Sequence, residues 1–128
     1  MKLNFETLVR LVVAGILAQT LFFKFSGAEE SVYIFSTLGI EPYGRIGSGI
    51  MELIAAILLL ISGTIGLGAV LALGVIFGAI VSHLSILGIE VMGDGGTLFY
   101  LALLVFFGSL WLAYKHRTEI PFVNKLFK

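Results

Sequence analysis

The chain contains no cysteine, so it can form neither a disulfide nor a Cys-X-X-Cys redox pair, and thiolate-bound zinc and iron–sulfur clusters are excluded as well. Any redox role therefore requires a bound cofactor or a partner protein. Charge is also scarce, because only 12% of the 128 residues are charged and eight basic side chains balance eight acidic ones. A chain without net charge has no overall field that would attract nucleic acid.

Apolar side chains take the place of the missing charges. They make up 59% of the residues, and the mean hydropathy of +1.09 lies far outside the range of soluble domains. Four runs are long enough to cross a bilayer as helices, at residues 7–25, 45–62, 65–88 and 97–114. We therefore predict one all-α domain over residues 1–128, a four-helix transmembrane bundle. The first run continues past Ala18 without a small-residue cleavage pair, so we expect a span rather than a signal peptide.

The segments between and after the spans carry their own signals. A Ser26-x-x-Glu29 capping box predicts a short helix that ends near Gly39, at the membrane surface or as a lid on the bundle. Only Ser62, Gly63 and Thr64 separate the second and third runs, which predicts a tight antiparallel hairpin. Residues 115–128 form a basic tail with apolar side chains at helical spacing, which is typical of a surface-bound helix.

The basic residues predict the orientation in the membrane. They cluster around the start of the first run and after the last one, at Lys2, Arg10, Lys115, Arg117, Lys125 and Lys128. The two predicted outer loops hold five carboxylates, Glu29, Glu30, Glu41, Glu90 and Asp94. Because lysine and arginine are enriched on the cytoplasmic side, we predict that both termini are cytoplasmic.

One carboxylate, Glu52, lies inside the second run. A charge near the middle of a lipid-embedded helix costs about 2.5 to 3.5 kcal/mol, so Glu52 must face protein, pair with a cation or be protonated. At about 1.5 Å per helical residue, Glu52, Gln19 and His83 all lie about 9 to 11 Å below the outer boundary. We therefore expect a pocket open toward the outer leaflet, in which Glu52 meets His83 or accepts a hydrogen bond from Gln19.

Chemistry in such a pocket would rest on few side chains. Glu52 and His83 are the candidate catalytic residues, since a buried carboxylate and an imidazole can relay protons or contact a quinone carbonyl. The candidate ligand-binding residues are Gln19, Lys24, Arg45 and Tyr43. Lys24 and Arg45 lie near helix ends, where snorkelling to the interface is the leading expectation. The alternative for the whole set is structural, because polar side chains also join membrane helices.

Other patterns point away from cofactor binding. The Gly74-x-x-x-Gly78-x-x-x-Ser82 stripe is expected to let two helices approach closely. One histidine and one buried glutamate make a poor metal site, so no metal is expected. A heme pair is not expected either, because the other histidine, His116, lies in the tail.

Several short motifs together resemble the DoxX family of small bacterial membrane proteins and its DoxX-like relatives, over essentially the full chain. They are Phe22-Phe23-Lys24-Phe25, Leu38-Gly39-Ile40-Glu41-Pro42, Gly49-x-x-Glu52-Leu53, Gly63-Thr64, Gly66-Leu67-Gly68, Gly78-Ala79 and His83. The resemblance implies a four-helix bundle in the bacterial cytoplasmic membrane, with Lys24, Arg45 and Glu52 at recurring polar positions. It also implies an association with sulfur and quinone redox systems. A thiol–disulfide role, known for some relatives, does not fit a chain without cysteine.

Three functions are consistent with these observations. The first is a redox-associated subunit that binds a quinone or similar lipophilic molecule and acts with a membrane or membrane-associated partner. The second is a non-catalytic assembly subunit, in which Glu52 only fixes helix register and the glycine faces dock other helices. The third is a small transporter or an isomerase-like enzyme, although no inverted repeat supports transport. The pattern leaves open a homo-oligomer.

Overall fold

The computed structural model describes residues 4–120 and is all-α, as predicted. The four long helices are α1 (Phe5–Ser26), α3 (Tyr43–Leu60), α4 (Ile65–Ser82) and α5 (Thr97–Lys115), and the short α2 (Glu29–Thr37) follows the first. The π-helix η1 (His83–Leu87) continues α4, and the 3-10 helix η2 (Arg117–Glu119) follows α5. The surface helix predicted for the tail falls mostly on residues 121–128, which lie outside the described residues.

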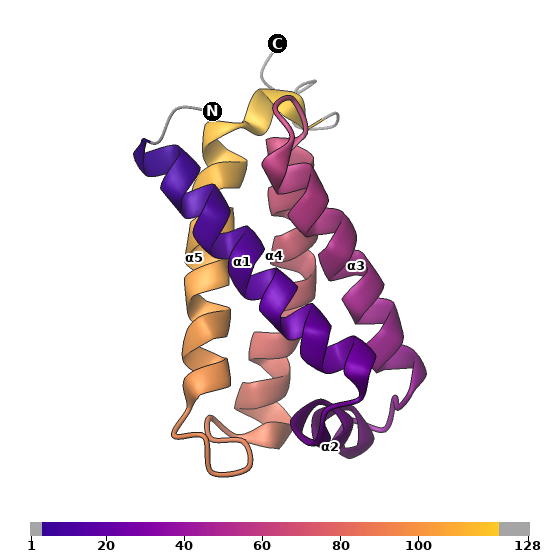
Figure 1. The fold of residues 1–128 in the computed structure, drawn as a ribbon. Helices are drawn as coiled ribbons and strands as arrows, with labels where there is room; N and C mark the ends of the chain where they lie inside the picture. The colour runs from indigo at the N-terminus through magenta and orange to yellow at the C-terminus, as the bar shows by residue number, and fades with distance from the viewer. Residues whose placement is uncertain (1–3, 121–128) are drawn as a thin grey trace.

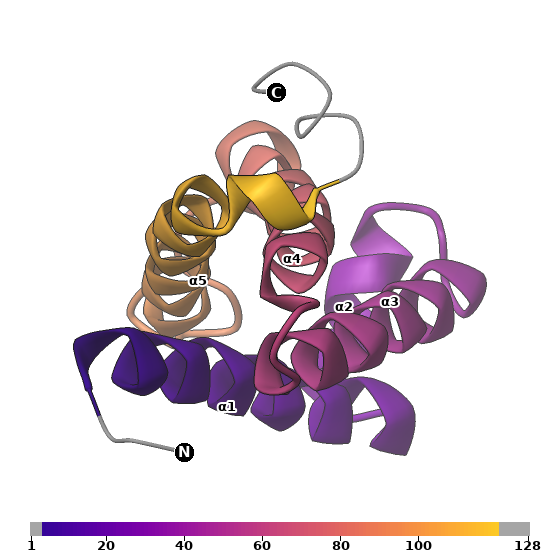
Figure 2. The same cartoon turned by 90° about the horizontal axis from the view of Figure 1, so that it is seen from above.

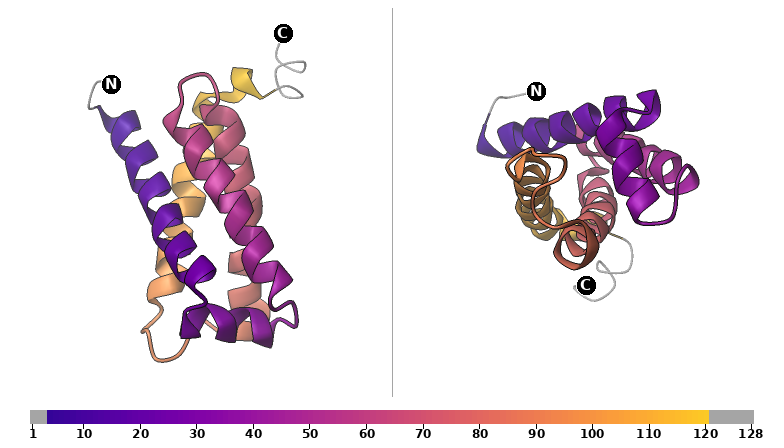
Figure 3. Two further views of the ribbon diagram at one scale, coloured as in Figure 1. Left: turned by 45° about the vertical axis from the view of Figure 1, so that its right-hand side comes forward. Right: turned by 90° about the horizontal axis from the view of Figure 1, so that it is seen from below.

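The long helices form a ring in which each packs against two neighbours, in the order α1, α3, α4 and α5 (Figure 2). Helix α1 is inclined across the others (Figure 1). Helix α2 lies crosswise at one end of the ring, which also holds the loop 88–96 (Figure 3). We call this the α2 end. The opposite end, here the η2 end, holds the start of α1, the turn between α3 and α4, and η2.

Four segments are long and apolar enough to cross a membrane: Phe5–Ser26, Tyr43–Leu60, Ile65–Leu87 and Thr97–Lys115. In each, only 28% of the most apolar stretch is buried inside the protein, so most of the apolar surface faces outward. Phe22 on α1, for example, is 69% exposed. Lipid is the solvent that suits such a surface, and helices meet its demand that backbone groups be paired internally. The chain is therefore a multi-pass membrane protein.

The first connection differs from the prediction. Ser26 does not cap α2 but is the last residue of α1, and Gly27 ends that helix with a left-handed φ of 69°. The N–H of Ala28 then donates to the carbonyl of Phe23 at 3.0 Å, as in a glycine-terminated helix. The capping-box prediction was wrong because it overlooked Gly27 as a stop signal, but the short helix itself is present.

The turn at the η2 end is tied by side chains that satisfy the last carbonyls of α3. The Thr64 hydroxyl donates to the carbonyl of Leu58 at 2.8 Å, and Arg10 Nε of α1 donates to the carbonyl of Leu59 at 2.8 Å. Arg10 is only 6% exposed. Carbonyls at a helix C-terminus lack helical partners and carry partial negative charge, so a buried guanidinium is well placed there. Arg10 thus joins α1 to α3, a role that sequence reasoning missed.

Close packing at the η2 end depends on Gly68 of α4. A Cβ at this position would lie 2.8 Å from the backbone nitrogen of Leu59 and 3.0 Å from the carbonyl oxygen of Ala55, both on α3. Around this contact lies the hydrophobic core, which includes Val13, Leu17, Ala55, Leu59, Ala69, Ala72, Val105 and Leu112. Gly68 therefore brings α4 into contact with the backbone of α3.

A polar cluster closes the same end. His116 lies between two carboxylates, with Nδ1 at 2.8 Å from Glu119 Oε2 and Nε2 hydrogen-bonded to Glu6. Lys115 Nζ lies 3.1 Å from the second oxygen of Glu6. Glu119 also accepts the N–H of Gly66 at 2.9 Å. These contacts connect the beginnings of α1 and α4 to the end of α5.

Candidate functional site

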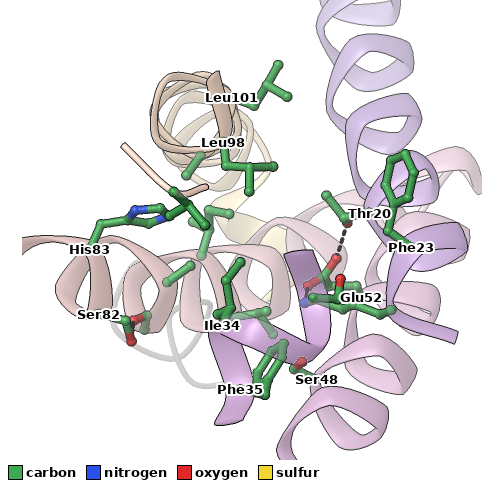
Figure 4. A pocket seen from close by; sticks show the side chains of 18 of the residues that line it. Thr20, Phe23, Ile34, Phe35, Ser48, Glu52, Ser82, His83, Leu98 and Leu101 are labelled. Carbon is green, nitrogen blue, oxygen red and sulfur yellow. Dashed lines mark hydrogen bonds and ion pairs between the residues drawn. The ribbon is translucent and has the colours of Figure 1, made fainter. Parts of the chain in front are cut away.

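A cavity of about 730 Å³ occupies the α2 end of the bundle (Figure 4). All five α-helices contribute to its walls, together with η1 and the loop 88–96. Most of the lining is apolar and includes Ile16, Leu17, Phe23, Ile34, Phe35, Leu38, Met51, Val75, Leu98, Leu101 and Val105. The polar lining consists of Thr20, Lys24, Glu30, Ser31, Ser48, Glu52, Ser82, His83, Asp94 and Thr97. Helix α2 thus forms part of the wall, as a lid would.

The glycine stripe of α4 lines this cavity instead of a helix contact. A Cβ added at Gly74 or Gly78 would meet no atom within 4 Å, and both residues face the cavity together with Ser82. Within the described residues no helix packs against these two positions, so the close approach expected there does not occur inside this chain. The reason is that a small residue permits close approach only where another helix lies opposite, and the sequence does not show where that is.

Glu52 is 3% exposed, and one of its oxygens contacts Thr20 of α1 (Figure 4). Lys24 donates to Oε1 and the Thr20 hydroxyl donates to Oε2. Thr20 and Lys24 are four residues apart and therefore lie on the same face of α1. A buried carboxylate needs a cation and further hydrogen bonds to offset its desolvation, and these two side chains provide them. We call Thr20, Lys24 and Glu52 the polar trio.

The aromatic ring of Phe35 lies beside the polar trio. Phe35 is buried on α2, and Lys24 Nζ lies 5.5 Å from the ring centroid. A cation over the face of a ring at this distance is attracted to it. This contact and the pair with Glu52 hold Lys24 inside the protein, with 14% of its side chain exposed. The leading expectation, that Lys24 snorkels to the interface, was therefore wrong.

His83 lies on the opposite wall of the cavity from the polar trio (Figure 4). It is 5% exposed, and its Nδ1 lies 2.9 Å from the carbonyl oxygen of Gly88. The imidazole packs edge-on against Phe99 with ring centroids 5.5 Å apart. His83 makes no hydrogen bond to Glu52 within residues 4–120, so the expected direct contact is absent and the cavity separates the two.

Asp94 organises the loop that borders the cavity near His83. Its carboxylate accepts the backbone N–H groups of Val91 at 3.0 Å, Gly96 at 2.8 Å and Leu98 at 3.1 Å. Partial burial raises the pKa of the Asp94 carboxyl. The three hydrogen bonds and the electrostatic effect of the nearby His83 lower that pKa by more, so that it lies below its ordinary value. Asp94 therefore fixes the start of α5 as a charged carboxylate.

The structure does not bring three of the candidate residues to the cavity. Gln19 is exposed on the outer side of α1, and Tyr43 is 86% exposed. Arg45 Nε donates to the Glu41 carboxylate at 2.8 and 3.1 Å, and the guanidinium also donates to the carbonyl of Lys24 at the end of α1. Arg45 thus joins the end of α1 to the start of α3 and lies outside the cavity lining. Glu52, His83 and Lys24 are the candidates that share the cavity.

Thr20 and Asp94 are two of the polar cavity residues that sequence reasoning missed. Thr20 occupies the place expected for Gln19, at nearly the same depth but rotated by about 100° around the helix axis. Its spacing of four from Lys24 was a usable signal, because it placed a hydroxyl on the face of α1 that holds a cation. Asp94 was noted only as a loop charge, although an acidic residue just before an apolar helix is typical of an N-terminal cap.

This arrangement can bind an uncharged, largely apolar molecule with polar groups at two ends. The lining supplies a large apolar area, a cation and hydroxyl on one side, and an imidazole on the other. Within residues 4–120 no group of three or more His, Asp or Glu side chains could hold a metal ion.

Comparison with known proteins adds no relative: no family model, no curated protein and no solved structure matches the chain. The resemblance to DoxX proteins therefore stays a prediction. The function has to be argued from the cavity and the side chains around it.

Proposed function

We propose that this membrane protein binds a quinone or another small lipophilic molecule in the cavity at the α2 end. The observation that carries the proposal is the cavity itself, which is about 730 Å³ in volume and mainly apolar, with few polar groups that converge on it. Small-molecule sites are commonly about 300 to 1,000 Å³, apolar, and furnished with a few well-placed polar side chains. An intramembrane ion pair on the wall of such a cavity is a functional candidate by default.

The polar trio supports recognition of an oxygen atom on the ligand. Lys24 has three N–H donors, and the described contacts use one of them on Glu52. The others are available to a carbonyl or hydroxyl oxygen in the cavity, which Lys24 lines. Because both oxygens of Glu52 already accept hydrogen bonds, its part is to hold the Lys24 side chain in place.

The proposed context is a redox-associated subunit that works with a partner protein. A chain without cysteine can take part in electron transfer only through a bound molecule or a partner. The resemblance to DoxX proteins supports a quinone and a place in the bacterial cytoplasmic membrane. The distribution of lysine and arginine favours cytoplasmic termini, which would open the α2 end toward the outer leaflet.

The polar trio provides the test. We expect that Thr20→Val weakens binding of a short-chain quinone analogue to the purified protein about fivefold, because it removes a hydroxyl that orients Glu52. The double change Lys24→Gln with Glu52→Gln is expected to weaken binding at least tenfold, since it removes the cation without leaving a buried unpaired charge. Fluorescence quenching or isothermal titration in detergent would measure both.

Arg45→Gln is the matched control, because it removes a cation near the same end of α1 but outside the cavity. Its affinity for the analogue should equal that of the unchanged protein, while gel filtration should show that all variants remain folded. Equal affinity in the double variant and the unchanged protein would remove the polar trio from the binding site. Absence of any binding to the unchanged protein would refute the proposed function.

One observation favours a non-catalytic assembly subunit as the second candidate. Lys24 and Glu52 satisfy each other across α1 and α3, as a pair that only fixes helix register would. Under this alternative, a larger membrane complex should co-purify with the chain and survive the double change at Lys24 and Glu52. Dissociation of that complex, with loss of quinone-analogue binding, would instead support the first candidate.

A further inference from the structure

Gly88 holds His83 in one orientation through hydrogen bonds of both its N–H and its carbonyl group. The backbone carbonyl of His83 accepts the N–H of Gly88 at 2.8 Å, which closes the π-helical turn of η1. Its ring nitrogen Nδ1 meets the carbonyl of Gly88 at 2.9 Å. The edge-on contact with Phe99 restricts the ring further. Short π-helical turns are rare and occur frequently at functional sites.

The contact with Gly88 determines which ring nitrogen carries the proton. A carbonyl oxygen only accepts hydrogen bonds, so Nδ1 must be the donor. In the uncharged imidazole, Nε2 then has a free lone pair and acts as an acceptor. Within residues 4–120 Nε2 makes no hydrogen bond, and the ring lines the cavity (Figure 4). The His83 wall thus presents a hydrogen-bond acceptor.

The opposite wall presents the complementary group, because Lys24 of the polar trio offers donors. We infer that the ligand carries a hydroxyl group that donates to His83 Nε2 and a second oxygen that accepts from Lys24. A hydroquinone or a related phenol meets both conditions, since a phenolic oxygen donates and accepts. This inference rests on the proposed function and specifies its ligand as the reduced, hydroxyl-bearing form.

The oxidised form fits the His83 wall less well. A quinone carbonyl and a methyl ether have only lone pairs, and either would place a lone pair against that of Nε2. Such a ligand would leave a buried acceptor unpaired, which costs more than the loss of an average hydrogen bond. The Lys24 wall, in contrast, accepts a carbonyl, a hydroxyl or an ether oxygen.

Gly88 is a positioning residue in this scheme. Its φ of 80° and ψ of 170° fall in a region that is open essentially to glycine alone. It lies outside the cavity lining, so a change there reaches the ligand through His83. Gly93, with φ of 75° and nothing within 4 Å of an added Cβ, is a loop glycine under a similar backbone constraint. Gly93 has no hydrogen bond to His83 and serves as its matched control.

The first experiment compares three probes on the unchanged full-length protein in nanodiscs, under anaerobic conditions. The probes are a heptyl-substituted hydroquinone, its oxidised benzoquinone and its dimethyl ether. We expect the hydroquinone to bind about tenfold more tightly than the other two, because only it pairs with Nε2. Equal affinities for all three, or tighter binding of the quinone, would overturn this inference and leave the proposed function standing. Failure of all three to bind would overturn both.

The second experiment assigns the discrimination to His83. His83→Phe and Gly88→Ala should each reduce the tenfold preference for hydroquinone over its dimethyl ether to less than about threefold, while affinity for the ether changes little. Gly93→Ala should retain the full preference. A preference that persists in His83→Phe would overturn the role of Nε2. The ratio of the two affinities is informative because a general loss of structure would weaken both probes together.

Discussion

The two halves of α4 use the same residue type for opposite purposes. In the first half, Gly68 faces the backbone of α3 and has no room for a Cβ. In the second half, Gly74 and Gly78 face the cavity, where an added Cβ would meet nothing within 4 Å. The first glycine brings two helices together, whereas the other two leave space in the wall of the cavity.

This difference shows that the meaning of a small residue depends on what lies opposite. The hairpin turn keeps α3 and α4 adjacent at the η2 end, where Arg10 and Thr64 also tie the last carbonyls of α3. Toward the α2 end, α1 has tilted across the bundle and α2 lies crosswise (Figure 1). Gly68, Gly74 and Gly78 are one to two helical turns apart, yet Gly68 packs against α3 while the other two face open space.

The largest effect is expected from Gly68→Val, which tests the packed half. The added side chain would press on the backbone nitrogen of Leu59 and the carbonyl oxygen of Ala55, which cannot move aside as a flexible side chain can. We expect the free energy of unfolding to fall by about 3 kcal/mol. The thermal unfolding midpoint in detergent would measure the loss.

Gly74→Val is the matched control for the open half. It adds the same side chain to the same helix where the cavity has room, so we expect a change in unfolding free energy within about 0.5 kcal/mol. Similar losses at the two positions would show that the two halves of α4 are packed alike, which would contradict the comparison.

Helical periodicity and hydropathy were enough to predict the architecture. All four predicted spans are helices within a few residues of their expected bounds, and the short helix after the first was also found. Position along the bundle was predictable too, because it follows from counting residues along a helix, and Glu52 and His83 line the same cavity. What the sequence did not reveal is rotation about the helix axis, which decides between Gln19 and Thr20.

Side-chain pairing was harder to predict than position along a helix. Arg45 is seven residues before Glu52 and nearly on the same face of the helix. Its guanidinium nevertheless pairs with Glu41, which lies four residues earlier, just before α3. Lys24 pairs with Glu52 because the crossing of α1 and α3 brings their ends together, and a crossing angle is not encoded in one helix alone. An ion-pair partner that is close in the sequence is therefore easier to predict than one that tertiary packing brings near.

The loop at the open end provides a pH-dependent test through Asp94→Asn. The pKa of this carboxyl is lowered in the folded protein, so its stabilising contribution is present above the unfolded pKa of about 3.9 and is lost as the pH falls through the lower folded value. We expect Asp94→Asn to lower the free energy of unfolding by about 1 kcal/mol near neutral pH. Unfolding midpoints from pH 7 down to pH 3 would measure it.

The difference between the Asp94→Asn variant and the unchanged protein should shrink at the acidic end of that range, where the carboxylate of the unchanged protein becomes protonated. A difference that stays constant down to pH 3 would mean that the hydrogen bonds, and not the charge, provide the stabilisation. Gly68→Val gives the contrast, because its loss arises from packing and should not depend on pH.

The smallest effect is expected from Gln19→Leu, which sharpens the comparison at one level of α1. Gln19 is exposed toward lipid and lies outside the cavity lining, whereas its neighbour Thr20 donates to Glu52. We expect the change to alter the free energy of unfolding by no more than about 0.5 kcal/mol and to leave binding of the quinone analogue as it was. Titration of Gln19→Leu beside Thr20→Val would measure both. If Gln19→Leu weakened binding as much as Thr20→Val, α1 would have to be rotated about its axis relative to this structure, and the polar trio would have a different membership.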